Sequence, residues 1–176
     1  MSKISLSDAK KYAKKICSAI RFEDTKNFEV YIVGSIAREE DRIGDYDFLI
    51  LTKDYIDKIL EGLYFTKNSN ITIKKIRSCG QYTCMLTLSM PNGNNLKVDI
   101  FYNTIPHKPF ALLHHIGPKS YNIRIRRLAN DRYNLSLNQY GLYDRITGKP
   151  VTKKFRSVED IQDYLDISRR PPHQRR

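Results

Sequence analysis

Two carboxylates open an apolar run, and this arrangement constrains the fold more than any other feature of the sequence. Asp45 and Asp47 stand two residues apart at the start of the run Tyr46–Leu51. Residues two apart in a strand point to the same face, so these side chains are predicted to lie side by side. Like charges that close repel unless a cation sits between them, and oxygen ligands favour a hard ion such as Mg²⁺. The pair therefore predicts a metal site on a strand.

A second short motif precedes this pair, at the end of an earlier apolar run. Gly34 and Ser35 offer backbone N–H groups and a hydroxyl to an anion, and Arg38 follows one turn later. A third carboxylate, Asp99, stands inside the later apolar run Leu96–Phe101. A metal beside a phosphate cradle is the equipment of phosphoryl transfer. The alternative is that Asp99 pairs with a nearby lysine, because a desolvated charge needs a partner.

The order and spacing of these motifs resemble the palm of the family X DNA polymerases, in the nucleotidyltransferase superfamily. The resemblance rests on Gly34-Ser35-x-x-Arg38, Gly44-Asp45-x-Asp47, Val98-Asp99-Ile100, and the segments His114 to Arg126 and Leu137 to Leu142. It covers nearly the whole chain and is closest to a very small viral member. It implies an α+β fold, with a nucleotidyltransferase palm of mixed or antiparallel sheet and helices, followed by a small α+β C-terminal domain.

The resemblance also implies a two-metal mechanism. Asp45 and Asp47 would bridge two Mg²⁺ ions about 3.5–4 Å apart, and Asp99 would hold the ion that activates the primer 3′-hydroxyl. Mn²⁺ is the expected substitute for Mg²⁺. The implied nucleotide-binding residues are Gly34, Ser35, Arg38, His114, His115, Gly117 and Asn122.

Two of these assignments carry alternatives. His114 and His115 stand where the family usually has two aromatic residues lining the sugar pocket, which leaves discrimination between deoxy- and ribonucleotides open. Asn122 and Arg126 fall four apart on a predicted helix and match the family's minor-groove readers of nucleotide and template. Arg126 is joined as an implied DNA contact by Arg124, Lys10 and Lys14. The alternative for each basic residue is a solvated helix face.

The net charge of +12 is unevenly distributed along the chain. Residues 1–104 hold 16 Lys and Arg against 13 Asp and Glu, a net of +3, and residues 105–176 hold 15 against 6, a net of +9. This asymmetry predicts a polyanion held by the basic part and processed by the other. We therefore place a palm at 1–104 and a basic nucleotide- and DNA-binding domain at 105–176. No apolar run approaches the length of a membrane span, so we expect a soluble intracellular protein, or a host-cytoplasmic and virion protein if it is viral.

Periodicity and turn residues predict the remaining elements. Ser5 and Asp8 have capping character before apolar residues at helical spacing. Strands are predicted at 28–33, 46–51, 71–77, 82–90 and 96–101, and helices at 54–63, 110–116, 120–129 and 157–165. A hairpin is predicted from 138–143 and 147–151, with Gly148 at its turn.

The cysteines are too few for a disulfide framework, since the chain has 3 of them. Cys17 falls on the apolar face of the first predicted helix. Cys79 and Cys84 bracket a predicted hairpin loop, where facing strand residues can reach disulfide distance. An intracellular setting favours free thiols, and a redox-dependent bridge is the alternative.

The resemblance implies a template-directed DNA polymerase that fills short gaps in base-excision-type repair. Its expected partners are gapped or nicked duplex DNA, deoxynucleoside triphosphates, a DNA ligase and a repair nuclease, and it is expected to act as a monomer without a membrane. One alternative is another nucleotidyltransferase acting on RNA ends, a protein side chain or a small molecule, which would not need Asn122 and Arg126. The other is a non-catalytic nucleic-acid-binding module, which would have no reason to keep three carboxylates in apolar strands.

Overall fold

A five-stranded sheet in the order β2-β3-β7-β6-β5 forms the centre of the N-terminal part. Its strands are β2 (Phe28–Ile32), β3 (Tyr46–Thr52), β7 (Asn95–Thr104), β6 (Thr83–Ser89) and β5 (Thr72–Cys79). β3 and β7 run parallel and the other neighbouring pairs are antiparallel, so the sheet is mixed. This arrangement confirms the predicted strands to within a few residues. The computed structural model describes residues 4–23, 27–53 and 62–175.

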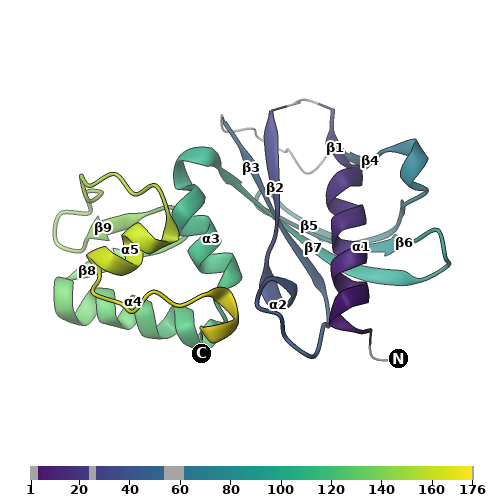
Figure 1. Cartoon of the computed structure of the whole chain (residues 1–176). Coiled ribbons are helices and arrows are strands. Elements are labelled where there is room, and N and C mark those ends of the chain that lie inside the picture. The colour runs from purple at the N-terminus through teal and green to yellow at the C-terminus, as the bar shows by residue number, and fades with distance from the viewer. Residues whose placement is uncertain (1–3, 24–26, 54–61, 176) are drawn as a thin grey trace.

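One face of this sheet is covered by helix α1 (Leu6–Ala19), as Figure 1 shows. The Ser5 side chain accepts the backbone N–H of Asp8 and caps the helix, as predicted. The buried face of α1 joins alternate residues of β3, β6 and β7 in one apolar cluster. The strand residues between them necessarily point to the opposite face. Two further strands, β1 (Ile20–Phe22) and β4 (Leu63–Phe65), pair antiparallel beside this cluster.

Helix α3 (Lys108–Ile116) packs against the opposite face of the sheet, and the short helix α2 (Gly34–Ala37) follows β2 with its Ile36 in the α1-side cluster. A small cluster of Val33, Leu49, Leu51 and Ala111 packs there, with α3 standing at the junction between the two parts of the molecule in Figure 1. A 3₁₀ turn (Ile105–His107) leads from β7 into α3. The face of β3 that carries Asp47 is therefore the face turned toward the C-terminal part.

The C-terminal part has its own apolar cluster, separate from that of the palm sheet. It is built from α3, α4 (Lys119–Tyr133), the strands β8 (Leu135–Leu137) and β9 (Leu142–Asp144), and α5 (Val158–Tyr164). Ser157 and Asp160 form a reciprocal capping box at the start of α5, as expected from a helix predicted to begin there. Short 3₁₀ turns also occur at Lys67–Ser69 and Pro172–Gln174.

The predicted hairpin after α4 has the wrong strand boundaries. Residues 138–141 form its turn, because the Asn138 side-chain oxygen accepts the backbone N–H groups of Tyr140 and Gly141. The segment 147–151 contributes one isolated bridge, between Tyr143 and Pro150, and no strand. The predicted turn at Gly148 does exist, and its φ of +68° suits glycine.

Two other expectations also need comment. Most of the helix predicted at 54–63 lies outside the described residues, and Leu63 begins strand β4 instead. The structure joins Cys79 and Cys84 by a disulfide at the end of the β5–β6 hairpin, so the expectation of free thiols is wrong for this pair. Their facing positions in the hairpin register make the bond geometrically accessible. Among the described helices, none is both long and apolar enough to cross a membrane.

Candidate active site

Two of the three predicted carboxylates come from neighbouring parallel strands and stand at the same level. Asp47 on β3 is the register partner of Asp99 on β7. Both side chains alternate with residues of the α1-side cluster, so both lie on the face turned toward the C-terminal part. Asp45 precedes β3 by one residue and borders a groove of about 710 Å³ between the 41–46 loop and the start of β7. The sheet thus places Asp47 and Asp99 side by side, with Asp45 near enough for its charge to act on both.

Gly34 packs directly against Asp47. A β-carbon built on Gly34 would stand 1.9 Å from Oδ2 of Asp47, and its φ of +62° is one that L-residues rarely adopt. The backbone N–H of Val33 donates to the Asp47 carbonyl over 2.9 Å, which ties the Gly34 turn to the strand. Glycine is therefore required here for two independent reasons, its backbone angle and its lack of a side chain.

Burial and mutual repulsion disturb the acidity of the carboxylates. Burial, followed by the neighbouring charges of Asp99 and Asp45, raises the pKa of Asp47 to about 6. Burial also raises the pKa of Asp99, and the nearby Arg77 guanidinium opposes that rise. A cation among these oxygens would relieve both the desolvation and the repulsion.

The three aspartates supply the oxygen ligands that suit a hard divalent cation, but their side chains do not point to one common position. Aspartate oxygens are what Mg²⁺ and Mn²⁺ prefer. Within residues 4–23, 27–53 and 62–175, no group of three or more His, Cys, Asp and Glu side chains is arranged to hold a metal ion as it stands. Asp99 is engaged elsewhere, because its Oδ1 accepts a hydrogen bond from Arg77 in an ion pair. Arg77 is the site residue that sequence reasoning missed.

Arg38 links α2 to the C-terminal part. Its Nη1 donates to the carbonyl of Ile116 at the end of α3 over 3.0 Å, and its Nε donates to Glu40 over 2.7 Å. Gly34 is buried and Ser35 half-buried at the start of α2, on the same turn as Arg38. The predicted phosphate cradle is thus assembled from one short segment, with its arginine bound to protein groups.

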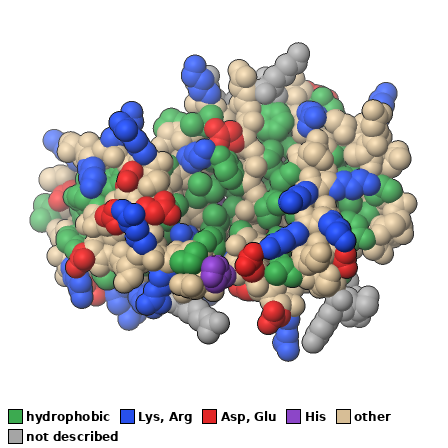
Figure 2. All heavy atoms as spheres, viewed as in Figure 1, with side chains coloured by type: hydrophobic (Ala, Val, Ile, Leu, Met, Phe, Trp, Pro, Cys, Tyr) green, Lys and Arg blue, Asp and Glu red, His purple; other side chains and the backbone are tan. Residues whose placement is uncertain are grey.

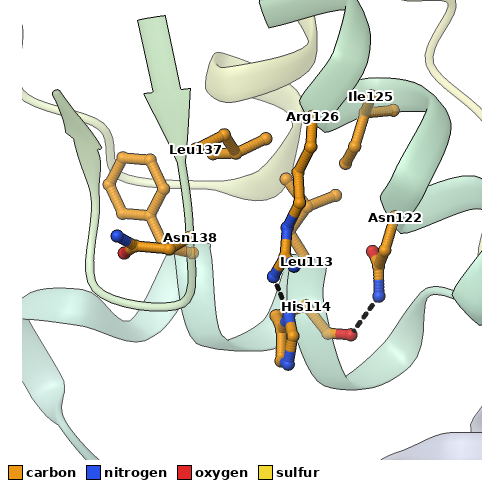
Figure 3. A pocket seen from close by; sticks show the side chains of 8 residues that line it. Leu113, His114, Asn122, Ile125, Arg126, Leu137 and Asn138 are labelled. Atoms are coloured by element: carbon orange, nitrogen blue, oxygen red, sulfur yellow. Dashed lines mark hydrogen bonds between the residues drawn. The ribbon is translucent and has the colours of Figure 1, made fainter. Parts of the chain in front are cut away.

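The predicted base-pair readers both meet His114 (Figure 3). The Asn122 side-chain amide donates to the carbonyl of His114 over 2.7 Å and to that of Gly117 over 3.2 Å. Arg126 Nη2 lies 2.7 Å from His114 Nδ1. Because a guanidinium only donates, Nδ1 must accept and the imidazole must be neutral. Burial and the charge of Arg126 lower the pKa of His114, which favours that state.

These contacts close the hollow between α3, α4 and β8. Figure 3 shows Asn122 and Arg126 turned toward His114 from neighbouring turns of α4, as their spacing predicts. The space left inside is only about 10 Å³. Gly117 is buried beside Asn122, and a β-carbon on Gly117 would stand 2.6 Å from the Asn122 side-chain oxygen. That oxygen is buried and has no hydrogen-bond partner in the described chain, so it is free to accept from a ligand that opens the hollow.

His115 packs as an aromatic residue. Its ring stacks on Phe101 of β7, with 4.4 Å between the ring centroids and 24° between the planes. Burial, with a smaller contribution from His114, lowers the pKa of His115 to about 3. The histidine therefore stays neutral at physiological pH and packs against Phe101 as an aromatic ring.

This burial predicts an acid-sensitive fold. Unfolded histidine takes up a proton near pH 6.5, whereas folded His115 does so only near pH 3, so stability is present above pH 6.5 and is lost as the pH falls. Between pH 7.5 and 5.0 we expect His115 to account for a loss of about 2 kcal/mol in the free energy of unfolding. Urea unfolding at both pH values measures this loss. The variant His115→Phe should lack it, and the exposed His173→Gln should retain it; equal losses in all three proteins would contradict the assignment.

The remaining residues implied as DNA contacts differ in whether another protein group already binds their side chains. Lys10 forms an ion pair with Glu39 at 2.6 Å, whereas Lys14 is exposed on α1. The exposed Arg124 guanidinium lies over the ring of Tyr121, 5.4 Å from its centroid. Figure 2 shows Lys and Arg side chains over both parts of one face of the molecule, with acidic side chains among them.

The segment Leu137 to Leu142 makes a second link between the two parts. Its turn brings the Gln139 carbonyl to the side-chain amide of the buried Asn103, 3.0 Å away, and the Tyr140 ring edge-on to that of Tyr82, with 6.3 Å between the ring centroids. The sequence gives no local sign of this contact, because the partners lie 36 residues apart.

The fold is similar to that of solved structures. The chain aligns over 99% of its length with 77% of Leishmania infantum polymerase beta in a ternary P/T complex, with a TM-score of 0.74 and 20% identity. A ternary gap complex of the same enzyme gives a TM-score of 0.75, 20% identity and coverage of 99% of this chain and 71% of that one. The chain thus has the fold of a polymerase beta, as the palm motifs predict.

Proteins with similar sequences identify the polymerase family to which the chain belongs. The Repair DNA polymerase X of African swine fever virus (isolate Warthog/Namibia/Wart80/1980) is 32% identical over 98% of this chain and 99% of its own. Human DNA-directed DNA/RNA polymerase mu is 34% identical over 51% of this chain and 18% of its own. Residues 111–176 match the family model of the DNA polymerase beta thumb. The chain belongs to family X of the DNA polymerases.

Proposed function

We propose that this family X DNA polymerase fills short gaps in duplex DNA during repair, by nucleotidyl transfer at the three aspartates. The observation that carries the proposal is the register of Asp47 and Asp99, which places two carboxylates side by side on the face turned toward the C-terminal part. A binding module would gain nothing from that costly pairing of like charges. Among the relatives, one is named a repair polymerase and another was solved in a gap complex, which supports DNA with a gap as the substrate.

The three aspartates would hold the divalent cations, Mg²⁺ with Mn²⁺ as a substitute. When bound there, two such ions lower the pKa of the primer 3′-hydroxyl and stabilise the charge on the departing pyrophosphate. Asp45 and Asp47 stand at the start of one strand, and Gly34 fixes Asp47 from one side. Asp99, on the neighbouring strand, would accept the hydroxyl proton.

The nucleotide would lie between α2 and the start of α4. Gly34 and Ser35 would offer backbone N–H groups to the triphosphate, and Arg38 would exchange the Ile116 carbonyl for phosphate oxygens, which bind a guanidinium more strongly. His114, His115, Gly117 and Asn122 would line the sugar and base. The side-chain oxygen of Asn122, which is buried without a hydrogen-bond partner among the described residues, would accept a hydrogen bond from it.

The DNA would contact the basic residues of both parts. Arg126 would give up its hydrogen bond to His114 and bind the template strand instead, where it would read the nascent base pair from the minor groove. Arg124, Lys10 and Lys14 would meet backbone phosphates, with Lys10 first leaving Glu39. We assign residues 1–104 to the palm and 105–176 to the nucleotide- and DNA-binding domain. The protein would act as a monomer inside the cell, in the host cytoplasm if it is viral. A repair nuclease would act before it, and a DNA ligase would seal its product.

The experiment that tests this function is single-turnover insertion into a duplex with a one-nucleotide gap. Purified protein, Mg²⁺ and each deoxynucleotide are supplied separately, and each ribonucleotide in parallel. We expect insertion of the nucleotide complementary to the template. Insertion that ignores the template, or transfer only to an RNA end, would instead indicate another nucleotidyltransferase, and no transfer to any end would indicate a binding module.

A further inference from the structure

Arg77 stands at an irregular position of the sheet edge. Along β5, Ile76 pairs with Leu86 and Ser78 with Met85, so Arg77 is the extra residue of a β-bulge. A bulge leaves its extra residue out of the ladder and redirects its side chain. Lys74 occupies a second bulge of the same strand, between Ile73 and Lys75. The edge strand therefore carries two cations at bulges, and Arg77 is the one for which the structure shows an ion pair with Asp99 among the described residues.

The redirected side chain crosses β6 to reach the third carboxylate. Met85 of β6 is the register partner of Asp99 on β7 and of Ser78 on β5, so β6 separates Arg77 from Asp99. The Arg77 Nε donates to the Leu86 carbonyl over 3.2 Å on the way, and its Nη2 donates to Asp99 Oδ1. The two side chains are 27% and 14% exposed, so the pair is only weakly screened by solvent.

We infer that Arg77 is the resident counter-ion of Asp99, and that a divalent cation must displace it to gain the third carboxylate. The inference goes beyond the proposed function but rests on one part of it, the role of Asp99 as a metal ligand. Arg77 is thus a positioning residue, which acts through Asp99 by holding its Oδ1 in an ion pair.

The charges make Arg77 and a divalent cation compete for Asp99. A guanidinium on one carboxylate oxygen neutralises the charge that attracts a divalent cation and repels that cation directly. The Leu86 carbonyl holds the arginine stem independently of Asp99, so the side chain keeps an anchor after it is displaced. Lys97, two residues before Asp99 on β7, adds a second nearby positive charge that stays in place in any Arg77 variant.

The test measures ion binding without turnover. Free Mn²⁺ is titrated by electron paramagnetic resonance against the protein alone, without DNA or nucleotide. We expect Arg77→Met, which keeps the aliphatic stem and removes the charge, to bind Mn²⁺ about five-fold more tightly than the unaltered protein. Arg77→Lys, which keeps the charge, should stay within about two-fold of the unaltered protein. Melting curves confirm that each variant is folded.

Lys74→Met is the matched control. It removes one cation from the other bulge of the same strand and should leave the Mn²⁺ affinity within about two-fold, because Lys74 has no ion pair with Asp99 among the described residues. Weaker or unchanged binding in Arg77→Met would overturn the inference. An equal gain in Mn²⁺ affinity in Arg77→Met and Lys74→Met would show that the loss of any positive charge has this effect. That result would also overturn the inference. If Asp99→Asn bound Mn²⁺ as well as the unaltered protein, the proposed metal site itself would be wrong and the inference would fall with it.

Discussion

Asp99→Asn should lower the rate of nucleotide insertion roughly a thousand-fold or more, which corresponds to about 4 kcal/mol of transition-state stabilisation. The amide keeps the size of the carboxylate but cannot supply its charge to a cation or accept the hydroxyl proton. Asp99 lies beside Asp47 in the sheet, so no other described carboxylate on β7 can replace it. Single-turnover insertion into a one-nucleotide gap, at saturating Mg²⁺, measures the loss.

The control must show that the loss is chemical and not structural. Asp131→Asn makes the same change on an exposed side chain of α4 and should leave insertion unaltered. Circular dichroism and DNA binding should be similar for both variants, because Asp99 is part of a strand whose pairing does not depend on its side chain. A folded Asp99→Asn protein that extends primers at the normal rate would refute the role assigned to this carboxylate.

Local signals in the sequence predicted most of the elements that carry the site. Apolar runs predicted β3 and β7, and the side-chain period of two in a strand was enough to place Asp45 and Asp47 on one face. The strands β1 and β4 were missed, because three-residue strands have no recognisable period and pair across a long separation in sequence. The boundaries after α4 were wrong because Asn138 caps a turn inside the segment predicted as a strand.

Side-chain partners were beyond the reach of the sequence. The ion pair of Arg77 with Asp99 depends on a bulge, and the spacing along β5 alone does not show where a bulge occurs. The predicted alternative for Asp99 was a nearby lysine, and its hydrogen-bonded partner proves to be an arginine 22 residues away. Arg38 and Arg126 were predicted as ligand contacts, and the sequence could not show that each is bound by a protein group, Ile116 or His114, before any ligand arrives.

Gly34→Ala is the second change expected to have a large effect. Alanine at φ +62° costs roughly 1–2 kcal/mol in any protein, because its β-carbon crowds the backbone. Here the same β-carbon would also stand 1.9 Å from Asp47 Oδ2, so either the carboxylate or the α2 turn must move. A displacement on the order of 1 Å at a catalytic group costs about a hundred-fold in rate. We therefore expect a loss of about 2 kcal/mol in the free energy of unfolding together with a fall of roughly a hundred-fold in insertion rate.

Gly44→Ala provides the matched comparison. Gly44 stands next to Asp45, but its φ is not in the left-handed region and a β-carbon there would meet nothing within 4 Å. It should keep stability within about 0.5 kcal/mol, and insertion should stay near normal. Urea unfolding and single-turnover insertion on both variants separate the two causes. If Gly34→Ala lost stability but inserted nucleotides normally, only the backbone angle would require glycine, and the close approach to Asp47 would have no catalytic importance. If both glycine variants lost activity equally, sensitivity of the whole segment, and not the contact with Asp47, would explain the loss.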